Sequence, residues 1–503
     1  MKLLPNVGGC NTILISVVLC IVSAPLCVDA QPPEISIGVA LPREPEARSP
    51  LLLKATSDSA NERNAFLFEG ALSPPVIRSA RGSQIKIDYL NQMSSHSKEI
   101  CVDGPCRNMT NLHFHGLHVS PAAPQDDVIT MMAMPGDTLH YIVDIPANQP
   151  PGLYWYHTHP HGESYQQALD GMSGAIVIEG IEQYVPEVAI MTERILVLRD
   201  FDLSRAPSSA ERIRKAVGAT TNPCGEAPGE LERVFTVNGV IRPKISIAAG
   251  ESQFWRIVNA SPDLYADLEV DSSTMKIVAI DGMPLAFHDP ARHSEVVQHV
   301  LVAPAGRVEA IVTAPQNAGA SLRTRCIDTG PDGDPNPAMV IADLDEGATP
   351  HATPTAIHPQ QLRLADSYPI SKHILGAIEK EEPAFVVKFT EDKQGFYIND
   401  KKYGPDDPPM TVVKVGHYAH WRVTNDTGEI HPFHIHQVHF LNYANDGRQI
   451  DDPVWMDTVN VPSHGSVDLV MDFTDPIIRG MSLFHCHLLK HEDKGMMAKI
   501  LFQ

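Results

Sequence analysis

The strongest constraint on this chain is the run His485-Cys486-His487 near its C-terminus. Side chains alternate between the two faces of an extended strand, so we expect the two histidines on one face and the cysteine on the other. A metal bound by the cysteine and a metal bound by the histidines would then lie on opposite sides of one backbone, a few covalent bonds apart. The run therefore predicts two neighbouring metal sites.

Two further ligand candidates follow this run. His491 lies five residues after Cys486, and Met496 lies ten residues after it. A thiolate, imidazoles and a weak axial thioether together form the ligand set of a blue-copper electron-transfer site. The C-terminal stretch therefore predicts a site of this kind.

Three more pairs of histidines with one intervening residue occur upstream: His113-Phe114-His115, His157-Thr158-His159 and His434-Ile435-His436. A single pair of this kind usually consists of two solvated histidines. Four pairs in two separated parts of the chain, one with a cysteine at its centre, instead predict a metal cluster. When the eight paired histidines are assigned to that cluster, His431 and His491 are left to join Cys486.

These patterns resemble the four copper signatures of the multicopper oxidases, in particular the bacterial laccase-like type with three domains. The matching stretches are His113 to Gly116, Tyr154 to His159, His431 to His436 and His485 to Met496. The resemblance implies four copper ions: one of type 1, one of type 2 and two of type 3. By position, it implies His431, Cys486 and His491 with an axial Met496 as type 1 ligands, His113 and His434 as type 2 ligands, and His115, His157, His159, His436, His485 and His487 as type 3 ligands.

The resemblance also implies an oxidoreductase that uses a small-molecule reductant and dioxygen. Phenolic or aromatic amine substrates would lose single electrons at the type 1 copper, and the trinuclear copper cluster would reduce dioxygen to water with four electrons. One alternative is a cuprous or other metal-ion oxidase in copper tolerance. Cuprous oxidases carry a long methionine-rich insertion, whereas residues 437–485 contain only Met456, Met471 and Met481. The non-enzyme alternative is a copper-free scaffold protein on the same fold, which the complete ligand set disfavours.

Two carboxylates are candidates for delivering the protons that dioxygen reduction needs. Glu492 follows His491 directly, as an acidic residue does in the bacterial laccase-like pattern. Asp126 follows the first histidine pair, where acidic residues often occur in the resembled family. We assign Glu492 and Asp126 as catalytic proton-relay residues. The alternative for each is a carboxylate that supports a ligand or lies at the surface.

Length and strand pattern predict three all-β domains. The chain has 503 residues, which corresponds to about three domains of roughly 150 residues each. Segments of alternating polarity, separated by frequent proline and glycine, predict β-sandwiches, and the resemblance implies cupredoxin-like Greek-key sandwiches. We expect copper-binding domains at residues 31–182 and 372–503, a copper-free spacer domain at 183–345 and a linker at 346–371. No His-x-His pair occurs between residues 183 and 345.

The N-terminus has the pattern of a secretory signal. Lys2 precedes a mostly apolar stretch from Thr12 to Leu26, and Val28-Asp29-Ala30 offers a small-residue cleavage site. We therefore expect cleavage of residues 1–30, export to the periplasm or the cell exterior, and no membrane span in the mature chain. The alternative is an uncleaved anchor. No twin arginine precedes the apolar stretch, although many bacterial members of the resembled family have one, so copper loading before export stays open.

The formal net charge of −22 constrains the partners of the chain. A surface this acidic disfavours nucleic acid and favours cationic substrates or metal ions, or it serves solubility outside the cell. The oligomeric state is left open, with a monomer favoured.

Five cysteines remain after the expected signal peptide, and an odd number in an exported protein indicates one unpaired thiol. Cys486 is the natural candidate, because a thiolate bound to copper cannot form a disulfide. Cys101 and Cys106 bracket a turn sequence, and Cys224 and Cys326 would then pair with each other. The alternative is that either pair stays reduced, which an oxidising compartment disfavours.

Overall fold

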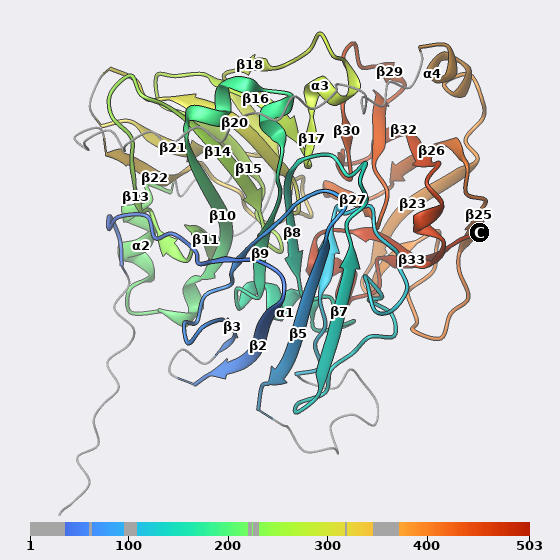
Figure 1. The fold of residues 1–503 in the computed structure, drawn as a ribbon, viewed down its shortest axis with the longest axis horizontal. Helices are drawn as coiled ribbons and strands as arrows, with labels where there is room; N and C mark the ends of the chain where they lie inside the picture. The colour runs from blue at the N-terminus through green and yellow to red at the C-terminus, as the bar shows by residue number, and fades with distance from the viewer. Residues whose placement is uncertain are drawn as a thin grey trace, which may run out of the picture. The chain divides into compact units, whose positions relative to one another are not determined.

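The strands form six sheets in the part of the chain that the computed structural model describes, residues 36–59, 63–94, 108–219, 224, 231–316, 319–345 and 372–503. The sheets occur as three pairs that follow one another along the chain (Figure 1). Each pair encloses its own apolar core, and is therefore a β-sandwich. The expected all-β class with cupredoxin-like sandwiches is confirmed.

The first sandwich pairs a sheet in the order β1-β4-β9-β8-β6 with a sheet in the order β3-β2-β5-β7. In β5, the buried residues Ile85, Ile87 and Tyr89 alternate with exposed ones, as in a strand with one face on the core. Its strands are β1 (Glu46–Ala47), β2 (Leu51–Asp58), β3 (Arg63–Leu67), β4 (Val76–Ser79), β5 (Gln84–Gln92), β6 (His113–His115), β7 (Thr138–Asp144), β8 (Gly152–His157) and β9 (Ser173–Ile178).

The second sandwich pairs a sheet in the order β12-β11-β10-β14-β20-β16-β17, with β18 beside β16, with a sheet in the order β13-β22-β21-β15-β19. Its strands are β10 (Thr192–Asp202), β11 (Arg233–Val237), β12 (Val240–Ile241), β13 (Lys244–Ser246), β14 (Ser252–Asn259), β15 (Ala266–Val270), β16 (Met275–Ile280), β17 (Met283–Pro284), β18 (Glu295–Val297), β19 (His299–Val302), β20 (Arg307–Thr313), β21 (Ser321–Thr324) and β22 (Met339–Asp345).

The third sandwich pairs a sheet in the order β24-β23-β26-β32-β28-β29, with β30 beside β28, with a sheet in the order β25-β34-β33-β27-β31. Its strands are β23 (Phe385–Asp392), β24 (Gly395–Ile398), β25 (Thr411–Val413), β26 (His417–Asn425), β27 (His431–Ile435), β28 (Phe440–Asn445), β29 (Arg448–Gln449), β30 (Trp455–Met456), β31 (Thr458–Val461), β32 (Ser466–Phe473), β33 (Gly480–Cys486) and β34 (Met497–Phe502).

The helices are short and connect the strands. No helix in the described ranges is long and apolar enough to cross a membrane. The α-helices are α1 (Ser164–Leu169), α2 (Ala210–Ala216), α3 (Leu285–His288), α4 (Lys372–Ile378) and α5 (Leu489–Asp493), and the 3₁₀ turns are η2 (Ile181–Gln183), η3 (Pro186–Ile190), η4 (Leu203–Arg205) and η6 (Pro476–Ile478).

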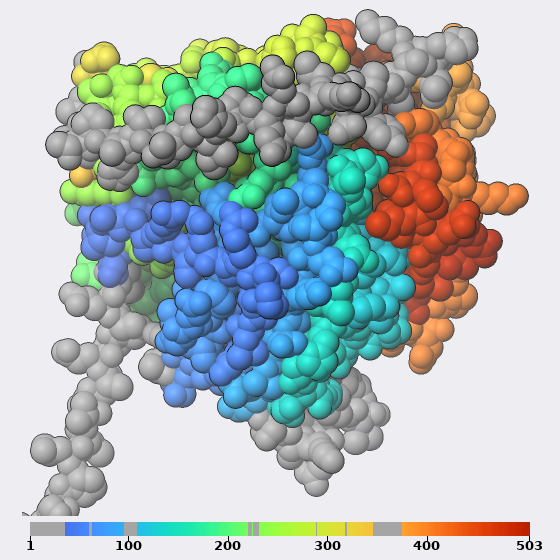
Figure 2. All heavy atoms as spheres, in the orientation of Figure 1, coloured from blue at the N-terminus to red at the C-terminus, as the bar shows by residue number. Residues whose placement is uncertain are grey.

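The sandwiches pack against one another through buried side chains. Leu153 and Trp155 of β8 share an apolar cluster with Val197 and Val258 of the second sandwich. Every residue of β8 is therefore buried, since both faces of this strand are covered. Figure 2 shows the first sandwich, in blue to cyan, directly beside the third, in orange to red. Residues 35–503 form one unit by their internal contacts, which allows a site to be shared between sandwiches.

The structure tests several of the expectations about cysteines and strands. Cys224 and Cys326 form a disulfide, with Cα atoms 5.5 Å apart, and Cys486 is free and buried. The expected signal peptide, the linker at 346–371, and Cys101 with Cys106 lie outside the described residues. The domain boundaries stay predictions. The expectation that His485 and His487 lie on one extended strand is wrong in part, because β33 ends at Cys486, and β8 and β27 likewise end before the second histidine of their pairs.

Candidate metal centre

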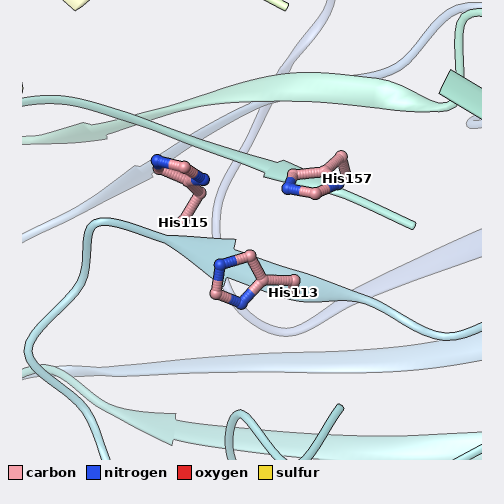
Figure 3. A group of neighbouring side chains, drawn as sticks. All are labelled: His113, His115 and His157. Carbon is pink, nitrogen blue, oxygen red and sulfur yellow. The ribbon is translucent and has the colours of Figure 1, made fainter. Parts of the chain in front are cut away.

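The eight paired histidines gather where the first sandwich meets the third. In the first sandwich, β6 lies beside β8 with His113 opposite His157. In the third, β27 lies beside β33 with His434 opposite His485. Figure 3 shows His113, His115 and His157, which come from two neighbouring strands, turned toward a common space. None of the eight is more than 1% exposed: His113, His115, His157, His159, His434, His436, His485 and His487.

Rings from the two sandwiches interleave. His113 stacks on His436, and His115 stacks on His434, each pair with ring centroids 3.8 Å apart. The Nε2 atom of His485 lies 3.2 Å from Nε2 of His436 and 3.4 Å from Nε2 of His159. Neither sandwich could form this cluster alone, because each supplies half of the rings.

The outer nitrogens of these rings are held by hydrogen bonds. His113 Nδ1 lies 3.0 Å from an Asp126 carboxylate oxygen, and His115 Nε2 lies 3.0 Å from an Asp457 carboxylate oxygen. Three Nδ1 atoms lie within hydrogen-bond distance of main-chain carbonyls: His157 to Thr158 O at 3.0 Å, His434 to Asp457 O at 2.8 Å and His485 to Cys486 O at 3.0 Å. Such contacts fix the orientation of a metal-binding imidazole.

Other ring nitrogens are buried without a hydrogen-bond partner in the described part of the chain, namely His113 Nε2, His115 Nδ1, His157 Nε2, His434 Nε2, His436 Nδ1 and both nitrogens of His487. Buried polar atoms are rarely left without a partner. Ring nitrogens of the cluster also lie close enough together to bind one ion, as in the groups His113–His115–His157 and His159–His436–His485. The donor set therefore fits bound metal.

Burial favours the neutral, metal-binding form of these imidazoles. Desolvation, followed by the neighbouring histidines, lowers the pKa well below its ordinary value for His115, His157, His159, His436, His485 and His487. Burial also lowers the pKa of His434, to about 3. The rings consequently offer lone pairs at neutral pH, and metal binding would not require them to lose protons.

Cys486 lies on the other side of the β33 backbone, as the alternation of side chains predicts. Its Sγ atom lies 3.4 Å from Nδ1 of His431, and that nitrogen lies 3.4 Å from Nδ1 of His491. The Nε2 atom of His431 lies 2.8 Å from the Thr427 hydroxyl, which leaves Nδ1 facing the sulfur. The three donors are buried and close enough to bind one ion.

Met496 lies next to this trio. It is fully buried, and its main-chain carbonyl accepts a hydrogen bond from the Cys486 N–H at 3.1 Å. Burial raises the pKa of the Cys486 thiol well above its ordinary value. A thiolate at this position therefore requires a nearby cation, which a soft metal would provide.

The outer face of His491 is covered by an aromatic ring and a carboxylate. The Phe396 ring stacks on it with centroids 3.8 Å apart, and the Glu429 carboxylate lies 3.5 Å from its Nε2. His491 is 6% exposed, whereas His431 is fully buried. The His491 side of the Cys486 site is therefore the side closer to solvent. Burial, together with Asp334 and other carboxylates, raises the pKa of Glu429 to about 9.

Comparisons with known proteins agree with this geometry. A multicopper oxidase family model matches residues 53–183, and a second matches residues 377–503, together slightly more than half of the chain. The chain belongs to the multicopper oxidase family. Copper is therefore the metal that the two donor sets would bind, and the enzyme class is an oxidoreductase with dioxygen as acceptor.

Individual relatives of this multicopper oxidase are distant in sequence, but the similarity extends over most of each chain. A multicopper oxidase of Staphylococcus haemolyticus is 21% identical over 448 residues, which cover 88% of this chain and 84% of the relative. A laccase of Haloferax volcanii is 24% identical over 487 residues, covering 88% and 78%. The structure of a Campylobacter jejuni multicopper oxidase, described as a metallo-oxidase, superposes with a TM-score of 0.69 at 21% identity over 94% of this chain and 97% of that one.

The two carboxylates expected to relay protons both contact cluster histidines. Glu492 is fully buried, with its carboxylate 3.1 Å from His485 Nδ1 and 3.6 Å from His159 Nε2. Burial raises the pKa of Glu492 well above its ordinary value. Asp126 is 1% exposed and accepts hydrogen bonds from Phe114 N–H and from the Gln437 amide. Because both carboxylates are buried, the alternative that they lie at the surface is excluded.

Asp493, which the sequence analysis did not assign, joins the first and third sandwiches beside Glu492. Its carboxylate accepts hydrogen bonds from the N–H groups of Gly162, Ser164 and Tyr165, at the start of α1. Burial raises the pKa of Asp493 to about 7. This contact holds α5, and with it Glu492, against the first sandwich.

The sequence analysis also missed Asp457 and Arg307, which lie beside His115 and His434. Asp457 is fully buried, and Arg307 is 1% exposed. The available signal for Asp457 was its place directly before strand β31, which is mostly buried. A charged residue at such a place needs a partner if it is buried, because buried charges are rare. Nothing in the sequence links Arg307 to the histidines, because it lies in the sandwich that has no His-x-His pair.

Proposed function

We propose that this protein is a laccase-like multicopper oxidase that couples one-electron oxidation of phenols or aromatic amines to four-electron reduction of dioxygen to water. The observation that carries the proposal is the pair of donor sets on opposite sides of β33. Cys486 faces His431 and His491, while the adjacent His485 faces His436 and His159. The two sets are thus joined by covalent bonds alone, which suits electron transfer between them.

Four copper ions would be held by this chain. His431, Cys486, His491 and Met496 would hold the type 1 ion. The type 2 ion would be held by His113 and His434, and the two type 3 ions by His115, His157, His159, His436, His485 and His487. Copper at these sites supplies one-electron redox chemistry when bound.

Proton delivery is assigned to Glu492 and Asp126. Glu492 supports this role because it lies beside two cluster histidines from different sandwiches and its carboxylate is fully buried. A protonated carboxyl there could supply a proton on the cluster side of β33. Asp126 contacts His113 on another side of the same cluster, from a position linked to Gln437.

The surroundings of His491 support an aromatic reductant. Phe396 is half-buried and lies flat on His491, so a second aromatic ring could stack at this edge. Glu429 supports the second candidate, a metal-ion oxidase, because its carboxyl group lies 3.5 Å from His491, where burial and other carboxylates raise its pKa, and a bound metal cation would favour the ionised, metal-binding form. The names of the relatives do not decide between the two, since one is a laccase and one is described as a metallo-oxidase.

A substrate panel tests this choice. The purified enzyme is assayed for kcat/KM with a methoxyphenol, an aromatic amine and Cu(I), alongside the variants Phe396→Leu and Glu429→Gln. We expect oxidation of the phenol and the amine, with a higher KM in Phe396→Leu. The metal-ion candidate is favoured instead if Cu(I) is the best substrate and Glu429→Gln, but not the neighbouring Glu391→Gln, raises its KM.

We further propose that residues 1–30 are cleaved, that the mature protein is exported to the periplasm or the cell exterior, and that it is a monomer acting without nucleic acid. The apolar stretch and small-residue site near Ala30 support export. The Cys224–Cys326 disulfide supports it independently, because disulfides persist in oxidising compartments. We also propose copper-binding domains at residues 31–182 and 372–503, a spacer domain at 183–345 and a linker at 346–371.

A further inference from the structure

Arg307 of the second sandwich forms a fully buried, two-pronged ion pair with Asp457 of the third. Its Nη1 atom donates to Asp457 Oδ1 at 2.7 Å, and its Nη2 atom donates to Asp457 Oδ2. Both side chains are completely inaccessible to solvent. Although burial alone would raise it, the charge and hydrogen bonds of Arg307 hold the pKa of Asp457 below its ordinary value. The fork geometry fixes the plane of the carboxylate as well as its charge.

Asp457 in turn holds two histidines of the cluster. Its Oδ1 atom lies 3.0 Å from His115 Nε2, and its main-chain carbonyl accepts from His434 Nδ1 at 2.8 Å. The nitrogens left for a metal are His115 Nδ1 and His434 Nε2, which have no hydrogen-bond partner among the described residues. His115 thus presents Nδ1, whereas His434 presents Nε2. Asp457 sets this choice, because its contacts occupy the opposite nitrogen of each ring.

The second sandwich also fixes the main chain of Asp457. Asp281 accepts a hydrogen bond from the Asp457 N–H at 3.2 Å and another from the Arg307 N–H at 2.8 Å. Arg307 Nη2 donates to the Asp281 carbonyl at 3.0 Å. Asp281 and Arg307 therefore clamp Asp457 from one side, through both its backbone and its carboxylate.

Gly116 completes this junction from the first sandwich. It follows His115 directly and has a φ of +83°. A Cβ atom at this position would lie 2.4 Å from Arg307 Nη2 and 2.5 Å from Asp457 Oδ2. A side chain is excluded there because the ion pair occupies the space. The three sandwiches thus meet at one point, beside His115 and His434.

We propose that Arg307 is a positioning residue for the trinuclear copper site, acting through Asp457 on His115 and His434. The sandwich without copper ligands is then more than a spacer, since it determines which nitrogens of these two histidines face the metal. This inference rests on the proposed function for the presence of copper. It concerns only the cluster side of β33, because Cys486, His431 and His491 do not contact Arg307 or Asp457 in the described structure.

The test is electron paramagnetic resonance and copper analysis of the purified holoenzyme and of Arg307→Lys. Lysine keeps the positive charge and loses the fork. We expect the type 1 signal and the blue band to be unchanged and the type 2 signal to be altered. Copper should be lost from the cluster to a chelator about 10- to 100-fold more readily. Asp457→Asn is measured in the same way, so that the result does not depend on one variant folding.

Arg256 provides the matched control. It is 4% exposed in the same sandwich and is paired with Glu193 and Glu309, but it has no contact with a cluster histidine among the described residues. Arg256→Lys should lower the melting temperature without changing the type 2 signal. The inference is overturned if the type 2 signal and the copper content of both Arg307→Lys and Asp457→Asn match those of the wild type, or if Arg256→Lys alters that signal equally. A wild-type holoenzyme without type 1 and type 2 signals would instead overturn the proposed function.

Discussion

Cys486 Sγ lies 3.4 Å from Nδ1 of His431, while the preceding residue, His485, points the other way and places its Nε2 3.2 Å from Nε2 of His436. His431 is the first residue of β27, and His436 directly follows the strand, so the two partners lie five residues apart. The adjacent strands β27 and β33 therefore contribute to both sites within a few residues: a sulfur-containing site on one side and an all-histidine site on the other. A metal on one side would have a covalent connection to a metal on the other.

Cys486→Ser should abolish the blue colour and the oxidation of substrate. A hydroxyl cannot replace a soft thiolate as a copper ligand, whereas the cluster histidines are untouched and should keep their copper. Absorption spectroscopy, copper analysis and substrate assays of the purified variant measure this. Wild-type turnover in Cys486→Ser would refute the assignment of this residue to electron transfer.

Glu492→Gln should slow the reaction with dioxygen and leave reduction of the blue site near normal. Glutamine keeps the size and hydrogen-bonding shape of the side chain but removes the ionisable proton. Because burial raises the pKa of Glu492, the wild-type carboxyl stays protonated over a wider pH range, and its advantage over the variant should shrink as pH rises through this raised pKa.

Stopped-flow absorption measures both half-reactions of Glu492→Gln. The blue band is bleached anaerobically with a reductant, and its return is followed after mixing with oxygen at several pH values. If reoxidation is unchanged at every pH while reduction slows, Glu492 acts on the reductant side and its assigned role is wrong.

Asp200→Asn should stabilise the protein more at pH 8 than at pH 5. Burial raises the pKa of Asp200 to about 7, against the opposing charge of Arg233. Between about pH 4 and this value, the folded protein keeps a proton that the unfolded chain has released. The stabilising contribution of that proton is full below about pH 4 and is lost as pH rises through 7, so wild-type stability falls across this window.

The expected difference between the two pH values is on the order of 1 to 3 kcal/mol in the free energy of unfolding. Denaturant unfolding at pH 5 and pH 8 measures it, with the exposed Asp144→Asn as a control. Arg233 keeps Asp263 and Asp334 as partners in the variant. An equal effect of Asp200→Asn at both pH values would contradict the raised pKa.

The cluster was predictable where local geometry decides the outcome. The alternation at residues 485–487 predicts the two faces, and the structure has Cys486 on one and the histidines on the other. His159, His436 and His487 lie beyond the strand ends, but they still join the cluster. Strand ends depend on where neighbouring strands stop pairing, which a single sequence does not specify.

The supporting residues were predictable only in part. Glu492 follows His491 in the chain yet contacts His485 and His159, because the short helix α5 turns its side chain back toward the cluster. Arg307 lies 150 residues from its partner Asp457. Contacts of this kind arise from the packing of whole sandwiches against one another, so no local pattern in the sequence indicates them.

Metal content with the absorption spectrum of the purified mature protein tests the central claim most directly, because it needs no knowledge of the substrate. The two donor sets predict about four copper ions per chain and a strong absorption band in the red from charge transfer between the Cys486 thiolate and Cu(II). A colourless protein that contains stoichiometric zinc instead of copper would contradict the account.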